Sequence, residues 1–375
     1  MASQTQYLLV SLPQSVNAFP YLERQLNQGK QQLTSFNLPE FQIKTLDSLV
    51  QLSEELSKLD TTLASSVAKV VDILDNLEPN KLFNETRVVN SRPAVYTVEN
   101  FSWNTSKYRV DKPIKTLVDL ISNDALSLDN DVRLMFQLYQ TAKSNFLAAD
   151  RKKNGDLSIK SLHEIVRPEH FVLDSDHLTT VLIAVPKNLV SDFHKSYETV
   201  TQFVVPRSAQ ELATDSEYLL FAVSLFKKYQ QEFVTACREH KWHPRTDFVY
   251  SEENLNELRR EFDTTRATES KSKIDLLRLA KTAYSEIFSA WFHIKAIRIY
   301  VESVLRYGLP PQFDCYAIKF EGSNVGNVDK AKKELIAKFG YLGGDGFSDK
   351  NNLHEYASLV DSDFEPFVLY HVDIV

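Results

Sequence analysis

Apolar residues recur at helical spacing along a segment that starts at Pro113, a residue favoured in the first turn of a helix. They are Ile114, Leu117, Ile121, Ala125, Leu128, Val132, Met135, Tyr139, Ala142, Phe146 and Ala149. After one early step their spacings alternate between four and three residues, which is typical of helices that wind around a partner helix. Basic residues at 151–153 complement the negative end of the helix dipole, and Asn154-Gly155 supplies a stop signal.

A second helical stripe lies further along the chain. Its members are Leu277, Ala280, Tyr284, Ile287, Trp291, Ile294 and Val301. Arg298 interrupts the series, and a glycine and two prolines between 308 and 311 end it. Upstream, residues 251–262 also have a helical pattern, whereas 263–273 are polar on every face. We expect that polar stretch to be an exposed part of the same helix.

Each stripe needs a surface to pack against, and each is a suitable partner for the other. Because residues 156–251 lie between them, the two helices can run antiparallel with that insertion at the far end. At 1.5 Å per residue, a helix of about 40 residues reaches roughly 60 Å. The pattern therefore predicts a mixed α+β fold with an elongated dumbbell shape, in which a long antiparallel coiled-coil neck joins two mixed α/β lobes.

Domain boundaries follow from this pairing. The helical neck comprises 113–155 and 252–308. The inserted lobe is 156–251, and the terminal lobe combines 1–112 with 309–375 and so contains both termini. Strands are expected, in chain order, at Tyr7–Pro13, Leu178–Pro186, Glu217–Phe226, Cys315–Phe320 and Phe367–Val375.

A third apolar stripe lies within residues 45–77. Its members are Leu49, Leu52, Leu56, Leu59, Leu63, Val70 and Leu77. We expect this helix to pack on the sheet of the terminal lobe, with packing against a partner helix as the alternative. In the inserted lobe, helices are expected near 191–199 and ending near His240. No internal repeat or low-complexity segment is apparent in the sequence.

Composition supports a folded, non-membrane protein. Of 375 residues, 43% are hydrophobic and 25% are charged, as in ordinary globular proteins rather than disordered ones. A net charge of −7 argues against nucleic-acid binding, which needs a basic face. The best apolar run, Tyr218–Phe226, is far short of the ~20 residues of a membrane span, and no signal-peptide pattern opens the chain. Cys237 and Cys315 form no disulfide framework, which favours a reducing, cytoplasmic setting.

Residue groups that would support catalysis or a bound cofactor are not apparent. The sequence has no GxxxxGK[ST] phosphate loop, and we interpret the glycine-rich stretch 340–346 as a loop. Asp150–Gly155 resembles a calcium loop only superficially, because Lys152 replaces a ligand and Ser161 stands where the bidentate glutamate belongs. No nucleophile, base and orienting group come together. We therefore expect a non-catalytic protein without a cofactor.

Two histidine-containing patterns each have a structural and a functional interpretation. Cys237, His240 and His243 could supply three metal ligands, but no fourth cysteine or histidine is nearby. A helix end packed on a core is the interpretation that we favour, and no metal is expected. His293, beside the helix-pair seam, is interpreted as packed or salt-bridged rather than catalytic.

Partner-binding candidates are aromatic. Trp242, Phe248 and Tyr250 lie where the inserted lobe rejoins the neck, and aromatic residues dominate interface energies. They either anchor a partner helix or pack the lobe onto the neck. A second set is assigned a structural role along the seam of the neck: Leu128, Val132, Met135, Tyr139, Tyr284, Ile287, Trp291 and Ile294.

Several long strings carry a family resemblance. They are WFHIKAIRIYVESVLRYGLPP at Trp291–Pro311, DRKKNGDLSIKSLHEIV at Asp150–Val166, FVLDSDHLTTVLIAVPKNL at Phe171–Leu189, LRLAKTAYSEIF at Leu277–Phe288, NLPEFQIKTLDSLVQLSEELSKLD at Asn37–Asp60 and HEYASLVDSDFEPFVLY at His354–Tyr370. Through them the chain closely resembles the C subunits of vacuolar-type proton-pumping ATPases, and the pattern is nearest the fungal members. The resemblance covers essentially the whole chain and matches least over the first ~35 residues and 320–329.

The resemblance implies a function. Members of that family are elongated, cytosolic and non-enzymatic, with a head and a foot joined by a helical neck. The head holds a peripheral stalk made of the E and G subunits. The foot contacts a second stalk and the cytosolic N-terminal domain of the membrane-sector a subunit. Family members take part in reversible separation of the two sectors at the vacuolar or endomembrane surface.

A free-standing cytoskeletal scaffold that cross-links actin is the rival hypothesis, since actin is a further candidate partner. It would need two basic or aromatic filament-binding patches, one per lobe, and the acidic balance of the chain does not favour it.

Overall fold

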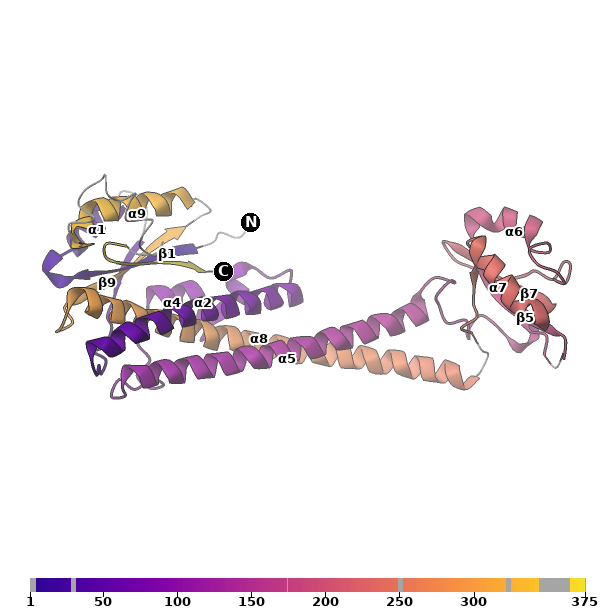
Figure 1. The fold of residues 1–375 in the computed structure, drawn as a ribbon, viewed down its shortest axis with the longest axis horizontal. Helices are drawn as coiled ribbons and strands as arrows, with labels where there is room; N and C mark the ends of the chain where they lie inside the picture. The colour runs from indigo at the N-terminus through magenta and orange to yellow at the C-terminus, as the bar shows by residue number, and fades with distance from the viewer. Residues whose placement is uncertain are drawn as a thin grey trace. The chain divides into compact units, whose positions relative to one another are not determined.

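The computed structural model describes residues 5–27, 32–173, 175–248, 252–321, 325–343 and 365–374. The chain is a mixed α/β protein with long helices and several sheets (Figure 1). It divides into two compact units. The first unit holds Met1–Phe136 and Asp275–Val375, and the second holds Gln137–Ile274. Within the described ranges, no helix combines the length and apolarity needed to cross a membrane.

Two long helices have residues in both units. Helix α5 spans Ile114–Asn154 and α8 spans Glu252–Tyr307, so the polar stretch 263–273 is helical as expected. The end of α5 coincides with the predicted stop signal. A Cβ atom on Gly155 would lie 2.4 Å from the carbonyl oxygen of Arg151, so only glycine fits there without a shift of the backbone. Gly308, with φ of +85°, follows the end of α8.

The first unit is built on a four-stranded antiparallel sheet in the order β10-β1-β9-β2. These strands are β10 (Val368–Ile374), β1 (Thr5–Pro13), β9 (Phe313–Glu321) and β2 (Gln32–Phe36). In the central strands Leu9 lies opposite Ala317 on one side and Tyr370 on the other. The other elements are α1 (Phe19–Asn27), α2 (Leu46–Leu77), α3 (Phe83–Thr86), β3 (Val88–Val89), β4 (Arg92–Pro93), α4 (Ala94–Glu99) and α9 (Val325–Phe339).

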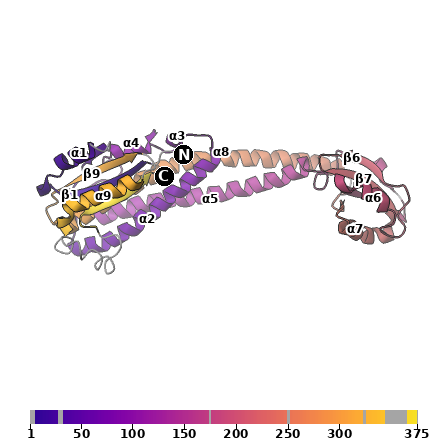
Figure 2. The same cartoon turned by 90° about the horizontal axis from the view of Figure 1, so that it is seen from above.

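Both faces of this sheet are covered, which explains why β1 is an almost continuous apolar run. Leu8, Val10 and Leu12 pack on one face with residues of α1 and α9. On the other face the hydroxyl of Ser303 in α8 donates to Ser11 at 2.7 Å, and Tyr7 reaches Glu99 in α4. Figure 1 and Figure 2 show α1 and α9 on one side of the sheet and α8 on the other.

The second unit has its own four-stranded sheet, in the order β6-β7-β5-β8. The strands are β6 (Gln210–Thr214), β7 (Tyr218–Phe226), β5 (Leu178–Pro186) and β8 (His243–Pro244), with helices α6 (Val190–Ser196) and α7 (Gln230–Glu239). Strand residues alternate between two buried clusters. Val181, Ile183 and Val185 pack beneath α6 and α7, whereas Leu182 and Ala184 face the segment 157–171.

The second unit contains a structural repeat that is not apparent as a repeat in the sequence. Strand β5, a 3₁₀ turn and α6 are followed, after β6, by β7, a 3₁₀ turn and α7. The backbone N–H of Lys187 donates to the carbonyl of Glu217 at 2.9 Å, and that of its counterpart Lys227 donates to the carbonyl of His177 at 2.8 Å. The two copies share backbone geometry and few residue identities. Sequence similarity therefore does not reveal the two copies.

Helix α2 is fixed to α8 by a buried charged group. The carboxylate of Asp60, 5% exposed, accepts from the indole N–H of Trp291 at 2.7 Å and from Lys295 at 3.0 Å. Arg298 donates to the same carboxylate at 2.7 Å, and its guanidinium lies 4.5 Å from the ring centre of Tyr370 in β10. Burial lowers the pKa of Lys295, while Asp60 acts in the opposite direction. Arg298, which interrupts the apolar stripe, is therefore part of this cluster.

Replacing Asp60 by asparagine should destabilise the protein strongly. The neutral amide leaves Lys295 and Arg298 without a carboxylate in a largely buried site, a change that costs about 3–5 kcal/mol of unfolding free energy. Urea unfolding followed by circular dichroism measures the loss. Glu55→Gln is the matched control, because it removes an exposed partner of Lys115 and should cost less than about 1 kcal/mol. Equal losses in the two variants would contradict the assignment.

Candidate functional site

Trp242, one of the three candidate anchors, lies inside the second unit. Its ring is 2% exposed and packs with the core beneath α6 and α7. The ring centre is 4.9 Å from that of Phe193 and 4.9 Å from that of His240. The backbone N–H of Trp242 donates to the carbonyl of Cys237 at 2.9 Å, immediately after α7. This position favours packing of the unit over anchoring of a partner.

Phe248 belongs to the opposite face of the same sheet. It is half-buried, with its ring centre 4.6 Å from His163 and 6.2 Å from Phe171. The structure thus separates Phe248 from Trp242 instead of bringing them into one patch. Tyr250, the third candidate, lies outside the described residues.

The cysteine and histidine side chains considered as metal ligands contact aromatic rings. Cys237 is fully buried, and burial raises its pKa to about 12. His240 stacks on Trp242, while His243 lies edge-on to Tyr218 at 5.5 Å. Across the described part of the chain, no group of three or more histidine, cysteine, aspartate or glutamate residues is placed to hold a metal ion. Cys315 is likewise buried with its pKa raised to about 12, so neither thiol is an available nucleophile at neutral pH.

In the second unit the end of α5 runs beside the beginning of α8. Phe146 and Phe262 have ring centres 5.7 Å apart, and Lys153 lies 4.0 Å above the ring of Phe262. Lys152 pairs with Glu261 at 3.1 Å. Tyr139, a predicted seam residue, is buried, and burial together with the nearby Glu269 raises its pKa. Later residues of α5 thus face earlier residues of α8, as two antiparallel helices require.

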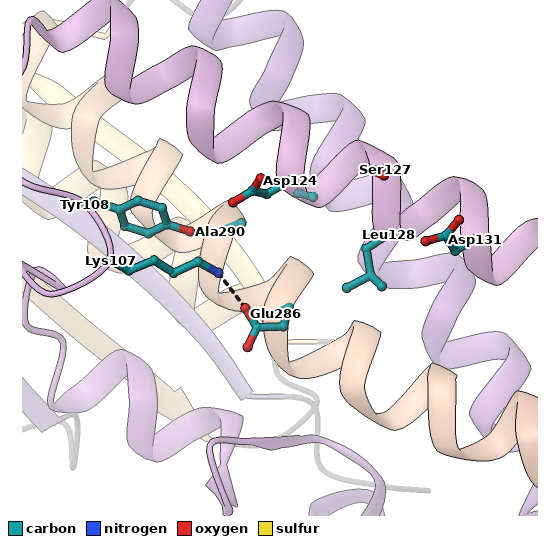
Figure 3. Close-up of a pocket in the computed structure, with 9 residues that line it drawn as sticks. Lys107, Tyr108, Asp124, Ser127, Leu128, Asp131, Glu286 and Ala290 are labelled. Atoms are coloured by element: carbon teal, nitrogen blue, oxygen red, sulfur yellow. Dashed lines mark hydrogen bonds and ion pairs between the residues drawn. The ribbon is translucent and has the colours of Figure 1, made fainter.

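In the first unit, α5 and α8 border a hollow of about 310 Å³ (Figure 3). Leu128 lines it from α5 and Ala290 lines it from α8. At its edge the ammonium of Lys107 donates to Glu286 at 2.7 Å. Leu128 is only partly buried here.

The remaining seam candidates are distributed along both helices. Val132 is 1% exposed, and Met135 is half-buried. Tyr284, Ile287, Trp291 and Ile294 are all buried in the first unit. The polar contact of Trp291 is with α2. Because Trp291 directly follows Ala290, its side chain points roughly 100° further around α8 than that of Ala290.

His293 has a structural position. It is 5% exposed and surrounded by the rings of Phe101, Trp103 and Tyr108, with centres 5.0–5.2 Å away. Its Nε2 accepts from the backbone N–H of Asn104 at 3.2 Å. The proton is therefore on Nδ1, which donates to the carbonyl of Ser289 at 2.7 Å. Burial lowers the pKa of His293, so the ring stays neutral.

One surface group was not singled out from the sequence. Phe203, Phe226 and Tyr229 gather at one end of the β5–β7 pair and line a hollow of about 320 Å³. We call this the aromatic hollow. The sequence FKKY at the end of a predicted strand was its one local signal, whereas Phe203 reaches the site from a loop.

The neutral His293 should make the protein sensitive to mild acid. Its pKa in the folded state lies below that of the unfolded chain, which is about 6.5. As the pH falls below about 6.5, the unfolded chain binds a proton that the folded state excludes, so unfolding free energy falls by up to about 1.4 kcal/mol per pH unit. His293→Gln keeps an acceptor for Asn104 and cannot titrate. Urea unfolding at pH 7.5 and 5.5 should show a smaller drop in the variant, and identical drops would refute this role.

Comparison with known proteins gives concordant matches. The family model that describes the C subunit of V-ATPase matches residues 7–368. The C subunit of the V-type proton ATPase of Saccharomyces cerevisiae is 49% identical, covering 98% of this chain and 97% of that protein. Its counterpart in Caenorhabditis briggsae is 34% identical over 100% of this chain and 98% of its own. The C 1-B subunit of the Danio rerio enzyme is 36% identical over 90% and 89% of the two chains.

Among solved structures, the cytoplasmic N-terminal domain of the V-ATPase I subunit, a homologue of the a subunit, aligns with 88% of this chain and 98% of its own. At 11% identity and a TM-score of 0.34, that alignment carries no conclusion. The family model and the full-length relatives are decisive, and they show that this chain belongs to the family of V-ATPase C subunits.

Proposed function

We propose that the chain is a non-catalytic connector of the vacuolar-type proton-pumping ATPase. It ties E–G peripheral stalks to each other and to the cytosolic N-terminal domain of the a subunit. The observation that carries the proposal is the division of one member of the V-ATPase C-subunit family into two compact units, both of which contain residues of α5 and α8. A connector needs at least two separate binding bodies, and this chain has a hydrophobic core for each.

The proposed shape is a dumbbell with a coiled-coil neck at 113–155 and 252–308. The inserted lobe at 156–251 is the head, and 1–112 with 309–375 is the foot. Two observations support this arrangement. Both helices are unbroken, at 41 and 56 residues, and their contacts are antiparallel.

The physical argument concerns torque. A rotary motor performs work only if its stationary parts resist rotation, so the stalks must be held at a fixed separation. Several modest contacts on one stiff chain combine through effective concentration into strong retention. Loss of one contact removes that gain, which makes release of the ATP-hydrolysing sector reversible. The proposed location is the cytoplasm and the cytosolic face of the vacuolar or endomembrane.

The absence of catalysis is part of the proposal. Both cysteines are buried with raised pKa values, and His293 is enclosed and neutral. These groups are therefore unsuited to nucleophilic or general-base chemistry at neutral pH. The actin cross-linking alternative stays a prediction, and none of the relatives reported above is named for actin.

Binding of the full chain to purified stalks tests the connector role. Calorimetry should detect binding to the E–G heterodimer, and light scattering should detect a larger assembly when the a-subunit N-terminal domain is added. The two contacts should be mutually reinforcing when all components are present, because the second becomes intramolecular. A chain that binds neither component, or only one of them under every condition, would contradict the role of a connector.

A further inference from the structure

The aromatic hollow exposes apolar ring surface. Phe203 is 56% exposed and Phe226 is 40% exposed. The ring of Phe203 is edge-on to Phe226 at 5.7 Å and stacked on Tyr229 at 5.0 Å. Phe203 thus contacts both of the other rings, and the three side chains line an open volume of about 320 Å³ with part of their area still in water. Aromatic groups of this kind are enriched where proteins bind partners.

The backbone at Phe203 is held in an unfavourable conformation. Its φ of +61° lies in the left-handed region, which bulky residues rarely adopt. The bridge between Val204 and Leu225 and the hydrogen bond from the N–H of Phe226 to the carbonyl of Phe203 fix it there. Strained backbone of this type is concentrated at functional sites. Here it accompanies a ring that projects into solvent.

The rim of the hollow is basic although the chain as a whole is acidic. Among the residues that the structure describes, Lys227 and Lys228 line it together with one carboxylate, that of Asp176. The ammonium of Lys227 donates to the carbonyl of Ser175 at 2.6 Å, and this hydrogen bond holds the ammonium at the rim. That of Lys228 lies 5.8 Å from the ring of Tyr229. A net charge of −7 for the chain makes this local excess of cations stand out, and the complementary surface is acidic.

The internal repeat shows that the fold does not require these side chains. At the other end of the β5–β7 pair the same turn, with the same backbone hydrogen bond, begins at Lys187. The counterparts of Phe226, Lys228 and Tyr229 there are Pro186, Asn188 and Leu189. Leu189 packs against the core instead of lining an open hollow. Phe226, Lys228 and Tyr229 therefore distinguish this end of the strand pair from the other.

We propose that the aromatic hollow is the surface through which the second unit binds the E–G stalk, by enclosing a large apolar side chain that is flanked by carboxylates on a stalk helix. This assignment rests on the proposed connector function and adds the position and chemistry of one contact. The apolar side chain displaces water from the three rings. The carboxylates beside it pair with Lys227 and Lys228 and select the partner by charge.

Phe203→Asn separates binding from folding. Asparagine tolerates positive φ better than phenylalanine does, so the melting temperature of the full chain should stay equal or rise. Affinity for purified E–G heterodimer, measured by calorimetry, should fall about tenfold or more, the loss expected of an interface anchor. A ring that merely packs the unit would give the reverse result, with a lower melting temperature and unchanged affinity, and that outcome would overturn the proposal.

Lys228→Glu tests the charge of the partner. It should weaken stalk binding and make the remaining affinity less sensitive to salt. Lys187→Glu is the matched control, because it makes the same change of charge at the other end of the repeat. It should leave the affinity unchanged, and an equal loss in the two variants would refute a local site.

The outcomes distinguish the inference from the function on which it rests. If the unaltered chain binds the stalk and the Phe203 and Lys228 variants bind equally well, the site assignment fails and the connector role stands. If the unaltered chain does not bind the stalk, the connector role itself fails. An anionic membrane is the competing occupant. Retention on phosphatidylcholine–phosphatidylserine vesicles that Phe203→Asn abolishes, with stalk binding intact, would reassign the hollow to lipid and overturn the proposal.

Discussion

The carboxylate of Asp60 is the constraint on which the first unit depends. It is a single anion held by an indole N–H, an ammonium and a guanidinium, all of them on one face of α8. Isolated charges are costly to bury, so α2 and α8 can approach only in the register that brings these groups together. Tyr370 extends the constraint to the sheet, because its ring lies under the guanidinium of Arg298. One interaction therefore sets the position of two helices and an edge strand.

Apolar periodicity predicted the long helices and the most buried strands well because it reflects burial directly, whereas short or edge elements such as β2, β6 and β8 were not predicted. The heptad stripe placed α5, and the alternating and continuous apolar runs placed β5 and β7 to within a residue. Side-chain partners were harder to predict. Trp242 and Phe248 are close in sequence and flank the short strand β8, yet they pack on opposite faces of the sheet. The apolar stripe predicted that Trp291 is buried, but it did not predict that the indole N–H would face Asp60 on α2.

The aromatic hollow was hidden from the sequence for a different reason. The residue type alone does not distinguish an exposed aromatic residue from a buried one. Only the structure shows that the backbone conformation of Phe203 turns its ring toward solvent. The repeat was hidden in the same way, since its two copies agree in hydrogen bonding and differ in most side chains. Backbone geometry can be retained while the surface chemistry of each copy changes. That freedom allows one end of a symmetric scaffold to become a binding surface.

The pairing of β1 with β9 and β10 also determines the order in which the chain can fold on the ribosome. Strand β1 lies near the N-terminus, and its two neighbours in the sheet are near the C-terminus. At the usual rates of synthesis, β1 must wait on the order of tens of seconds for them. The second unit is contiguous in the chain and can form its sheet meanwhile. During that interval the apolar run of β1 has two unsatisfied edges, which is a template for pairing with another molecule until β9 and β10 arrive.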